Sequence, residues 1–167
     1  MEIPQAMTSD QIELWVQWFV HAANIAALAG FNIVELHAAH GYGLNQWLSP
    51  VTNQREDEFG GDITNRAKLL FRIVTKIKTQ FPELLLAVRL PAQDHYTGGL
   101  SASEMIWVVN QLEILGVDFA AVGRAILKKP ADWGSMNLYV KKSIGRIVGV
   151  RKYKCTVNEN DYCQRAK

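Results

Sequence analysis

The sequence predicts an α/β fold in which helices alternate with buried parallel strands. In three long segments, apolar residues recur at helical spacing. Each of these segments is followed by a short, continuously apolar run, which is typical of a strand buried in a parallel sheet. Polar residues and glycines follow each run, as they do in the loops that connect strands to helices.

The first predicted helix begins at Thr8, which forms a T-x-x-Q capping box with Gln11. Gly30 is expected to end it. Its apolar residues at helical spacing are Ile12, Trp15, Val16, Phe19, Ala23, Ala26 and Ala27. The first strand is predicted over residues 31–37, FNIVELH.

A long connection is predicted over residues 41–64, because glycines, Pro50 and Asn53 interrupt the periodicity. One helical turn is expected inside it, around residues 44–48. A connection of this length inside a compact domain is usually functional.

Two further helix–strand units follow. Apolar spacing predicts a helix over residues 64–81, closed by Pro82, and a buried strand over residues 84–90. The third unit has a helix that starts at the capping box of Ser101 and Glu104, and a strand at residues 119–122. Beyond it we expect a helical piece from Trp133 to Lys142. The domain is predicted to span residues 1–150, followed by a polar tail at residues 151–167.

Composition is that of a globular domain, with 49% hydrophobic residues among 167. The 18 basic residues face 16 acidic ones, so the chain lacks the dense basic stripe of a nucleic-acid-binding surface. It has neither a long apolar span nor a signal-like amino terminus, so we expect a cytoplasmic protein without a membrane segment. Cys155 and Cys163 are expected to be reduced and unpaired.

Candidate chemistry follows the first strand, where His37, His40 and Tyr42 lie within six residues. If the chain turns at Gly41, the two imidazoles can converge on a carbonyl or nitro oxygen, and the phenol can deliver a proton. A structural role for the histidines is the alternative. A metal site is disfavoured because no third ligand is evident, Glu35 being expected to point away from His37.

Two further strand ends carry arginines. Arg89 near the end of the second strand is costly to bury, so we expect it to meet an anionic ligand or to form a structural ion pair with Glu35 or Asp94. Gly123 and Arg124 follow the third strand, where backbone N–H groups and a guanidinium suit a phosphate.

Several motifs together resemble the old yellow enzyme family of NADH:flavin oxidoreductases. They are ELHAAHGY at residues 35–42, QWLSP at 46–50, TNQR at 52–55, DEFGG at 57–61 and NR at 65–66. Weaker matches follow in the same order, namely VR at residues 88–89 and VGRAILKKP at 122–130. The resemblance covers roughly residues 4 to 133.

The resemblance implies an FMN-dependent (β/α)8 barrel that takes hydride from NADH or NADPH and passes it to a small electron-poor alkene. By position, His37 and His40 are similar to the pair that binds the substrate's carbonyl oxygen, and Tyr42 to the catalytic tyrosine. Arg89 is similar to the arginine that contacts the flavin ring, and Gly123 and Arg124 to part of the FMN phosphate site. No metal is implied.

Polar residues of the long connection are interpreted as structural, forming a network that holds one loop shape. They are Asn53, Arg55, Asp57, Glu58, Asn65 and Arg66.

The sequence departs from the family in length, since a complete barrel needs about 250 residues. Only three to four βα units are expected, an incomplete (β/α)8 barrel whose sheet edges are open. A homo-oligomer or a complementing barrel fragment would complete the sheet. The alternative to the oxidoreductase is an inactive truncated remnant or oligomerising module without a complete flavin site.

Overall fold

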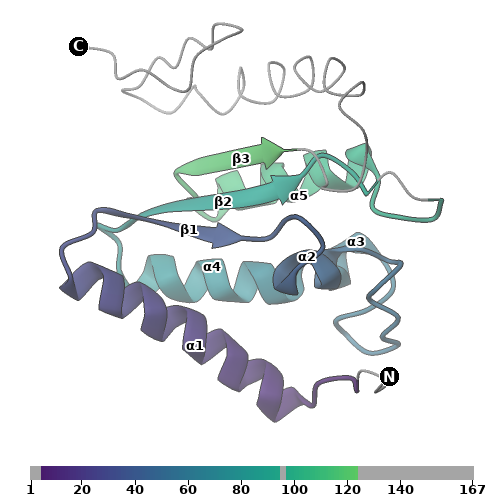
Figure 1. Ribbon diagram of the computed structural model, residues 1–167, viewed down its shortest axis with the longest axis horizontal. Helices are drawn as coiled ribbons and strands as arrows, with labels where there is room; N and C mark the ends of the chain where they lie inside the picture. Colours follow the sequence, from purple (N-terminus) through teal and green to yellow (C-terminus); the bar gives the residue numbers. More distant parts are fainter. Residues whose placement is uncertain (1–4, 95–96, 124–167) are drawn as a thin grey trace, which may run out of the picture.

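The computed structural model describes residues 5–94 and 97–123. These residues form three successive helix–strand units (Figure 1). The elements in chain order are α1 (Ser9–Leu28), β1 (Ile33–His37), α2 (Gly43–Leu48), α3 (Ile63–Arg66), α4 (Lys68–Gln80), β2 (Leu85–Pro91), α5 (Ala102–Ile114) and β3 (Phe119–Gly123).

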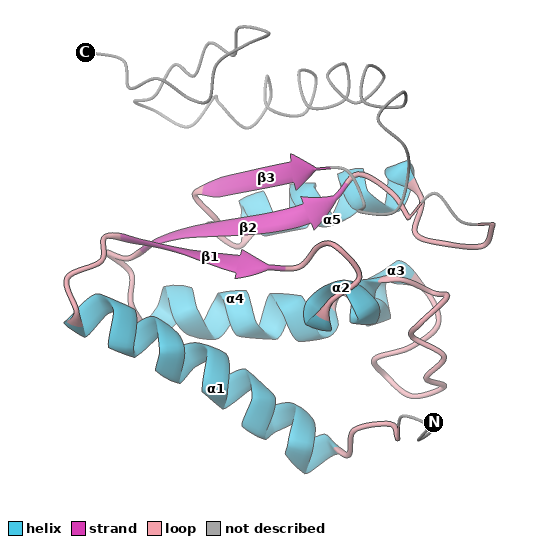
Figure 2. Ribbon diagram, in the orientation of Figure 1, coloured by secondary structure: helices cyan, strands magenta, loops and turns pink. Residues whose placement is uncertain are grey.

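The three described strands form one parallel sheet in the order β1-β2-β3, so sheet order equals chain order. In register, His37 of β1 pairs with Arg89 of β2, and Pro91 of β2 pairs with Gly123 of β3. All three strands point the same way, toward the end of the molecule that holds α2 and α3 (Figure 2). The residues that follow the strands are therefore gathered at one end of the sheet.

One face of the sheet packs on the helices and forms the core. The strand residues of this face are Val34, Leu36, Leu86, Val88, Leu90, Ala120 and Val122. They join buried helix residues such as Ile73, Ile77, Val108 and Leu112 in a single apolar cluster. α1 and α4 lie side by side under this layer (Figure 1). Alternation along each strand then leaves the opposite face turned away from the helices.

The opposite face exposes residues of all three strands and changes character along them. At the strand starts it is apolar, with Ile33, Leu85 and Phe119 each about two-fifths exposed or more. Toward the strand ends it carries His37 and Arg89, which are also exposed. An apolar start and a polar carboxyl end are the layers found along the inside of a βα-barrel, whose active sites lie at the carboxyl ends of the strands.

Apart from the helix predicted over residues 64–81, the predicted elements of residues 5–94 and 97–123 are confirmed, with boundaries shifted by up to two residues. Both capping boxes form, at Thr8 with Gln11 and at Ser101 with Glu104. The single helix predicted over residues 64–81 is wrong, because the structure divides it into α3 and α4 at Ala67. α3 has its own N-cap, Asp62, whose carboxylate accepts from the backbone N–H of Asn65, so the polar cap starts a separate turn.

Other predictions lie outside the described residues. These are the helical piece at 133–142, the domain boundary at 150, the tail at 151–167 with both cysteines, and Arg124. Within residues 5–94 and 97–123, no helix is long and apolar enough to cross a membrane.

Candidate active site at the strand ends

The turn after β1 brings His37 and His40 together. Their ring centroids lie 4.8 Å apart, with the ring planes inclined by 57°. The expected reversal occurs one residue earlier than Gly41, because His40 itself adopts a positive φ of 66° and Gly41 continues with 75°. The two imidazoles therefore share one small region at the carboxyl end of the sheet, as the sequence predicted.

Tyr42 lies beside this pair at the start of α2. Its ring centroid is 6.4 Å from that of His37, and the residue is 65% exposed. It occupies the N-cap position of α2 with extended backbone and makes no side-chain cap. Its hydroxyl is therefore not committed to capping this helix.

Arg89 lies next to His37 in the sheet register and forms an ion pair with Glu35. The distance from Arg89 Nε to Glu35 Oε1 is 2.9 Å, and both side chains are about two-fifths exposed. The structural ion pair expected for Arg89 is thus present with Glu35. The expectation that Glu35 points away from His37 is wrong, because residues two apart on a strand share a face.

Burial and the neighbouring charges favour the neutral form of the His40 imidazole. Burial lowers the pKa of His40 below its ordinary value of 6.5, and the neighbouring His37 and Arg89 lower it further, while Glu35 opposes them. A neutral imidazole has one N–H donor and one acceptor. His40 can therefore donate a hydrogen bond to a substrate oxygen around neutral pH without carrying a net charge.

Gly123 ends β3, and its carbonyl accepts from the backbone N–H of Ala92 at 2.8 Å. A Cβ added at Gly123 would meet no heavy atom of the described residues within 4 Å, so they leave the space beside its backbone open. Such an opening suits a group that approaches the backbone closely. Gly123 is thus the described residue of the predicted phosphate site, and its predicted partner Arg124 lies outside the described residues.

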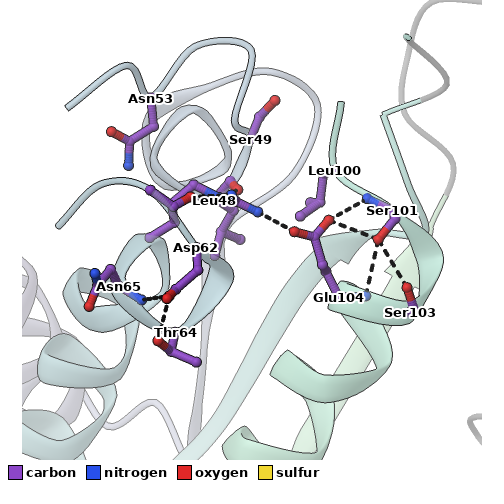
Figure 3. A network of polar contacts seen from close by, with 12 residues as sticks. Leu48, Ser49, Asn53, Asp62, Thr64, Asn65, Leu100, Ser101, Ser103 and Glu104 are labelled. Atoms are coloured by element: carbon purple, nitrogen blue, oxygen red, sulfur yellow. Dashed lines mark hydrogen bonds and ion pairs between the residues drawn. The ribbon is translucent and has the colours of Figure 1, made fainter. Parts of the chain in front are cut away.

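Behind the site, Arg66 ties three segments together. The residue is 4% exposed; its Nε donates to the carbonyl of Leu48 at 2.8 Å and its Nη1 to that of Gly61 at 2.5 Å. Nη2 pairs with Glu104 Oε1 at 2.5 Å. Figure 3 shows Glu104 joined also to Ser101, the cap of α5. The structural role predicted for Arg66 agrees with these contacts.

The other polar residues of the connection contribute unequally. Asn53 is buried and donates through Nδ2 to the carbonyls of Trp47 and Phe59 at 2.7 and 2.8 Å. Arg55 pairs with Asp57 and lies over the Trp47 ring. By contrast, Glu58 makes a 3.8 Å exposed contact with Lys68, and Asn65 takes part through its backbone N–H. The loop shape depends mainly on Asn53, Arg55 and Arg66.

Glutamate, histidine and aspartate side chains do not form a metal cage in the described part of the chain. No group of three such residues, cysteines included, is placed to hold an ion among residues 5–94 and 97–123. Glu35 lies on the same face as His37, but its carboxylate is paired with Arg89.

The chain is similar to known proteins. A model of the NADH:flavin oxidoreductase / NADH oxidase family matches residues 1–157. The chain belongs to this family. An NADPH dehydrogenase of Halalkalibacterium halodurans is 40% identical over 118 residues, which are 71% of this chain and 35% of the relative. The chain thus spans about a third of the length of the curated relatives that it matches.

Solved structures of NADH:flavin oxidoreductase relatives confirm the predicted fold. Morphinone reductase, solved in complex with tetrahydroNAD, is 30% identical with a TM-score of 0.65, covering 73% of this chain and 34% of that protein. Old Yellow Enzyme from Pichia sp. AKU4542 is 31% identical with a TM-score of 0.64, covering 71% and 34%. The three described βα units therefore correspond to a part of the (β/α)8 barrel of these relatives.

Sequence reasoning missed two residues that support the site of this family member. Asn45 is buried in α2 and accepts a hydrogen bond from the turn that carries His40. Glu104 was recognised as a helix cap, but its second role as the partner of Arg66 depends on a contact between distant segments. No local pattern indicates the pairing of Glu104 with Arg66. By contrast, Gly41 and Asn45 are four residues apart, a spacing at which a side chain can reach a nearby backbone N–H.

Proposed function

We propose that this chain forms part of an FMN-dependent oxidoreductase that passes hydride from NADH or NADPH to a small electron-poor alkene. The observation that carries the proposal is the convergence of His37 and His40 beside Arg89 at the carboxyl end of the sheet. The family supports flavin chemistry, and relatives named NADPH dehydrogenase support a nicotinamide reductant.

The histidine pair binds the oxygen of the substrate's activating group. Each imidazole donates one N–H to a carbonyl or nitro oxygen, and the two hydrogen bonds stabilise negative charge as it develops there. Withdrawal of electrons onto this oxygen leaves the distant alkene carbon electron-poor and ready to accept hydride. The lowered pKa of His40 favours this role, because a neutral donor binds a neutral carbonyl without the larger desolvation of a cation.

Tyr42 supplies the proton that completes reduction of the alkene. Its phenol lies beside the histidine pair and is exposed, so it can reach a substrate held there and re-equilibrate with solvent. A phenol can transfer a proton directly to the substrate carbon as a general acid.

The residues present fit a flavin at the open sheet face. Arg89 presents a guanidinium on that face, where positive charge would stabilise an electron-rich ring, and Gly123 leaves its backbone open for a phosphate. Bound FMN would accept hydride from NAD(P)H and donate it to the alkene. Glu35, held to Arg89 Nε, orients the guanidinium.

The first experiment is a visible absorbance spectrum of the purified chain after FMN is added and the excess removed. We expect stoichiometric flavin in the wild-type chain and loss of flavin in Arg89→Met. The matched control is Arg72→Met, which removes an exposed arginine paired with Glu13 outside the site and should retain flavin. Because β1 and β3 are open edges among the described strands, we expect the flavin-binding form of the purified chain to be a homo-oligomer.

A folded wild-type chain that retains no FMN would contradict the proposal. The chain would then keep the scaffold of the family without its cofactor site, which is the alternative function. Circular dichroism of the same sample separates this result from failure to fold.

The second experiment measures the reduction of 2-cyclohexenone by the flavin-loaded chain. His37→Ala and His40→Ala should each slow this step on the order of a hundredfold, because one oxyanion donor is lost. Equal rates in both variants and the wild type would reject the role of the pair.

A further inference from the structure

The turn that carries His40 is strained. Among residues 5–94 and 97–123, His40 is the only non-glycine residue with a positive φ, and its φ is 66°. An L-residue in this left-handed region crowds its Cβ against the backbone and persists only where the surroundings hold it. Here the strained conformation has a geometric result, since it folds the His40 ring back to 4.8 Å from that of His37.

Asn45 is the side chain that holds this turn. Its Oδ1 accepts a hydrogen bond from the backbone N–H of Gly41 at 2.7 Å. This hydrogen bond determines the orientation of the Asn45 amide, because the Nδ2 group cannot accept a hydrogen bond. Asn45 is 3% exposed and lies between Leu44 and Leu48 of α2, both fully buried in the core, so the acceptor is rigidly placed.

The same amide carries an unfavourable feature. Asn45 Nδ2 is buried and has no hydrogen-bond partner in the part of the chain that the structure describes. A buried unpaired donor is destabilising, and a leucine of similar size would avoid it. Two unfavourable features, the strained His40 and the unpaired Nδ2, thus lie within six residues, which is a pattern typical of functional sites.

We propose that Asn45 is the positioning residue of the histidine pair: by holding the Gly41 N–H, its Oδ1 keeps His40 left-handed and its ring beside His37. This inference rests on the proposed function, in which the pair binds the substrate oxygen. Without the acceptor, His40 relaxes toward a negative φ and its ring leaves His37. A single imidazole then remains to bind the oxygen.

The test compares Asn45→Leu, Asn45→Asp and Gln46→Leu. Asn45→Leu removes the acceptor while keeping an apolar side chain of similar size. Asn45→Asp keeps an oxygen that can accept from Gly41. Gln46→Leu is the matched control, an exposed amide on the same helix that is one residue away.

The structural readout is the nuclear Overhauser effect between ring protons of His37 and His40. We expect it in the wild type, in Asn45→Asp and in Gln46→Leu, and we expect its loss in Asn45→Leu. The functional readout is 2-cyclohexenone reduction, which should fall at least tenfold in Asn45→Leu, with FMN retained, and recover in Asn45→Asp. A ring contact that survives in Asn45→Leu would overturn the proposal.

Hydrogen exchange of the wild-type Gly41 amide gives a test that needs no variant. Gly41 is exposed, so its amide exchanges quickly unless Asn45 holds it. Slow exchange is expected, and fast exchange would contradict the inference even if Asn45→Leu fails to fold. If the wild type binds no FMN, the proposed function fails. The nuclear Overhauser effect between the histidine rings and the exchange rate of the Gly41 amide still test the role of Asn45.

Discussion

A guanidinium buried to 4% exposure is stable only where its donors find acceptors, and Arg66 finds three. Two are backbone carbonyls, of Leu48 and Gly61, and one is the carboxylate of Glu104. Although burial raises the pKa of Glu104, hydrogen bonds from Ser101 and Arg66 outweigh it, and the net pKa lies below the ordinary value. One side chain therefore joins α2, the long connection and α5.

Replacement of this arginine should unfold the protein before it alters substrate choice. We expect Arg66→Met to lower the free energy of unfolding by about 3 kcal/mol or more, since one carboxylate and two backbone carbonyls lose the donor that a buried guanidinium supplied. Urea denaturation measures this difference. Lys68→Met, at an exposed 3.8 Å contact with Glu58, is the control and should change stability by no more than about 0.5 kcal/mol. Normal stability with lost turnover in Arg66→Met would contradict the structural role.

His40 gives the fold a dependence on pH. Its pKa is lowered by burial and then by His37, so the unfolded chain binds this proton at a higher pH than the folded chain does. Stability should therefore fall as the pH drops below the ordinary value of 6.5, until the folded His40 is also protonated. Urea midpoints between about pH 8 and about pH 5 measure this loss.

The control is His40→Asn, because asparagine tolerates a positive φ and does not titrate in this range. We expect a shallower loss of stability in this variant. Glu35→Gln should lower the pKa of His40 further, since Glu35 raises it, and an NMR titration of the imidazole would show the shift. A wild-type and a His40→Asn curve of equal slope would reject the assignment.

At the scale of elements, the sequence predicted each helix and strand of the described part but not the break between α3 and α4. Apolar spacing runs across Ala67 without interruption, whereas the break depends on Asp62 as a second cap and on Arg66 reaching backward. The meeting of His37 with His40 was predicted from a glycine in the turn. The left-handed His40 and its support by Asn45 were not, because an isolated histidine gives no sign of its φ.

The long connection has one position where only glycine fits. A Cβ added at Gly60 would lie 1.7 Å from the carbonyl oxygen of Arg55. We expect Gly60→Ala to destabilise the protein by about 3 kcal/mol, since the backbone itself must move. Gly98→Ala is the comparison, because its φ is 74° but no atom of the described residues lies within 4 Å of an added Cβ. A loss of about 1–2 kcal/mol is expected. Thermal denaturation measures the stability of both variants. Equal losses of stability would contradict the close approach of Gly60 to the Arg55 carbonyl.

Across the whole molecule, the sheet is covered on one face and open on the other. β2 is paired on both sides, whereas β1 and β3 are each paired on one side among the described strands. Leu86, Val88 and Leu90 of β2 are fully buried. Stability against local opening should therefore be greatest in the middle of the sheet.

Native-state hydrogen exchange should show this ranking. We expect the slowest-exchanging amides of the sheet in β2, and faster exchange in β1 and β3. If amides of β1 or β3 exchange as slowly as those of β2, another strand pairs with that edge in solution. Dilution of the protein would then show whether the extra pairing comes from a second copy.

The identity of sheet order and chain order has a kinetic consequence. Each described strand pairs with the strand made just before it, so no strand has to insert between two that are already paired. Contacts of this kind can form in the order of synthesis, because each new strand meets a partner that has already left the ribosome. A nascent chain that has not yet reached Phe119 already contains all residues of β1, β2, α1 and α4. The amino-terminal units can therefore begin to fold on the ribosome before β3 has been made.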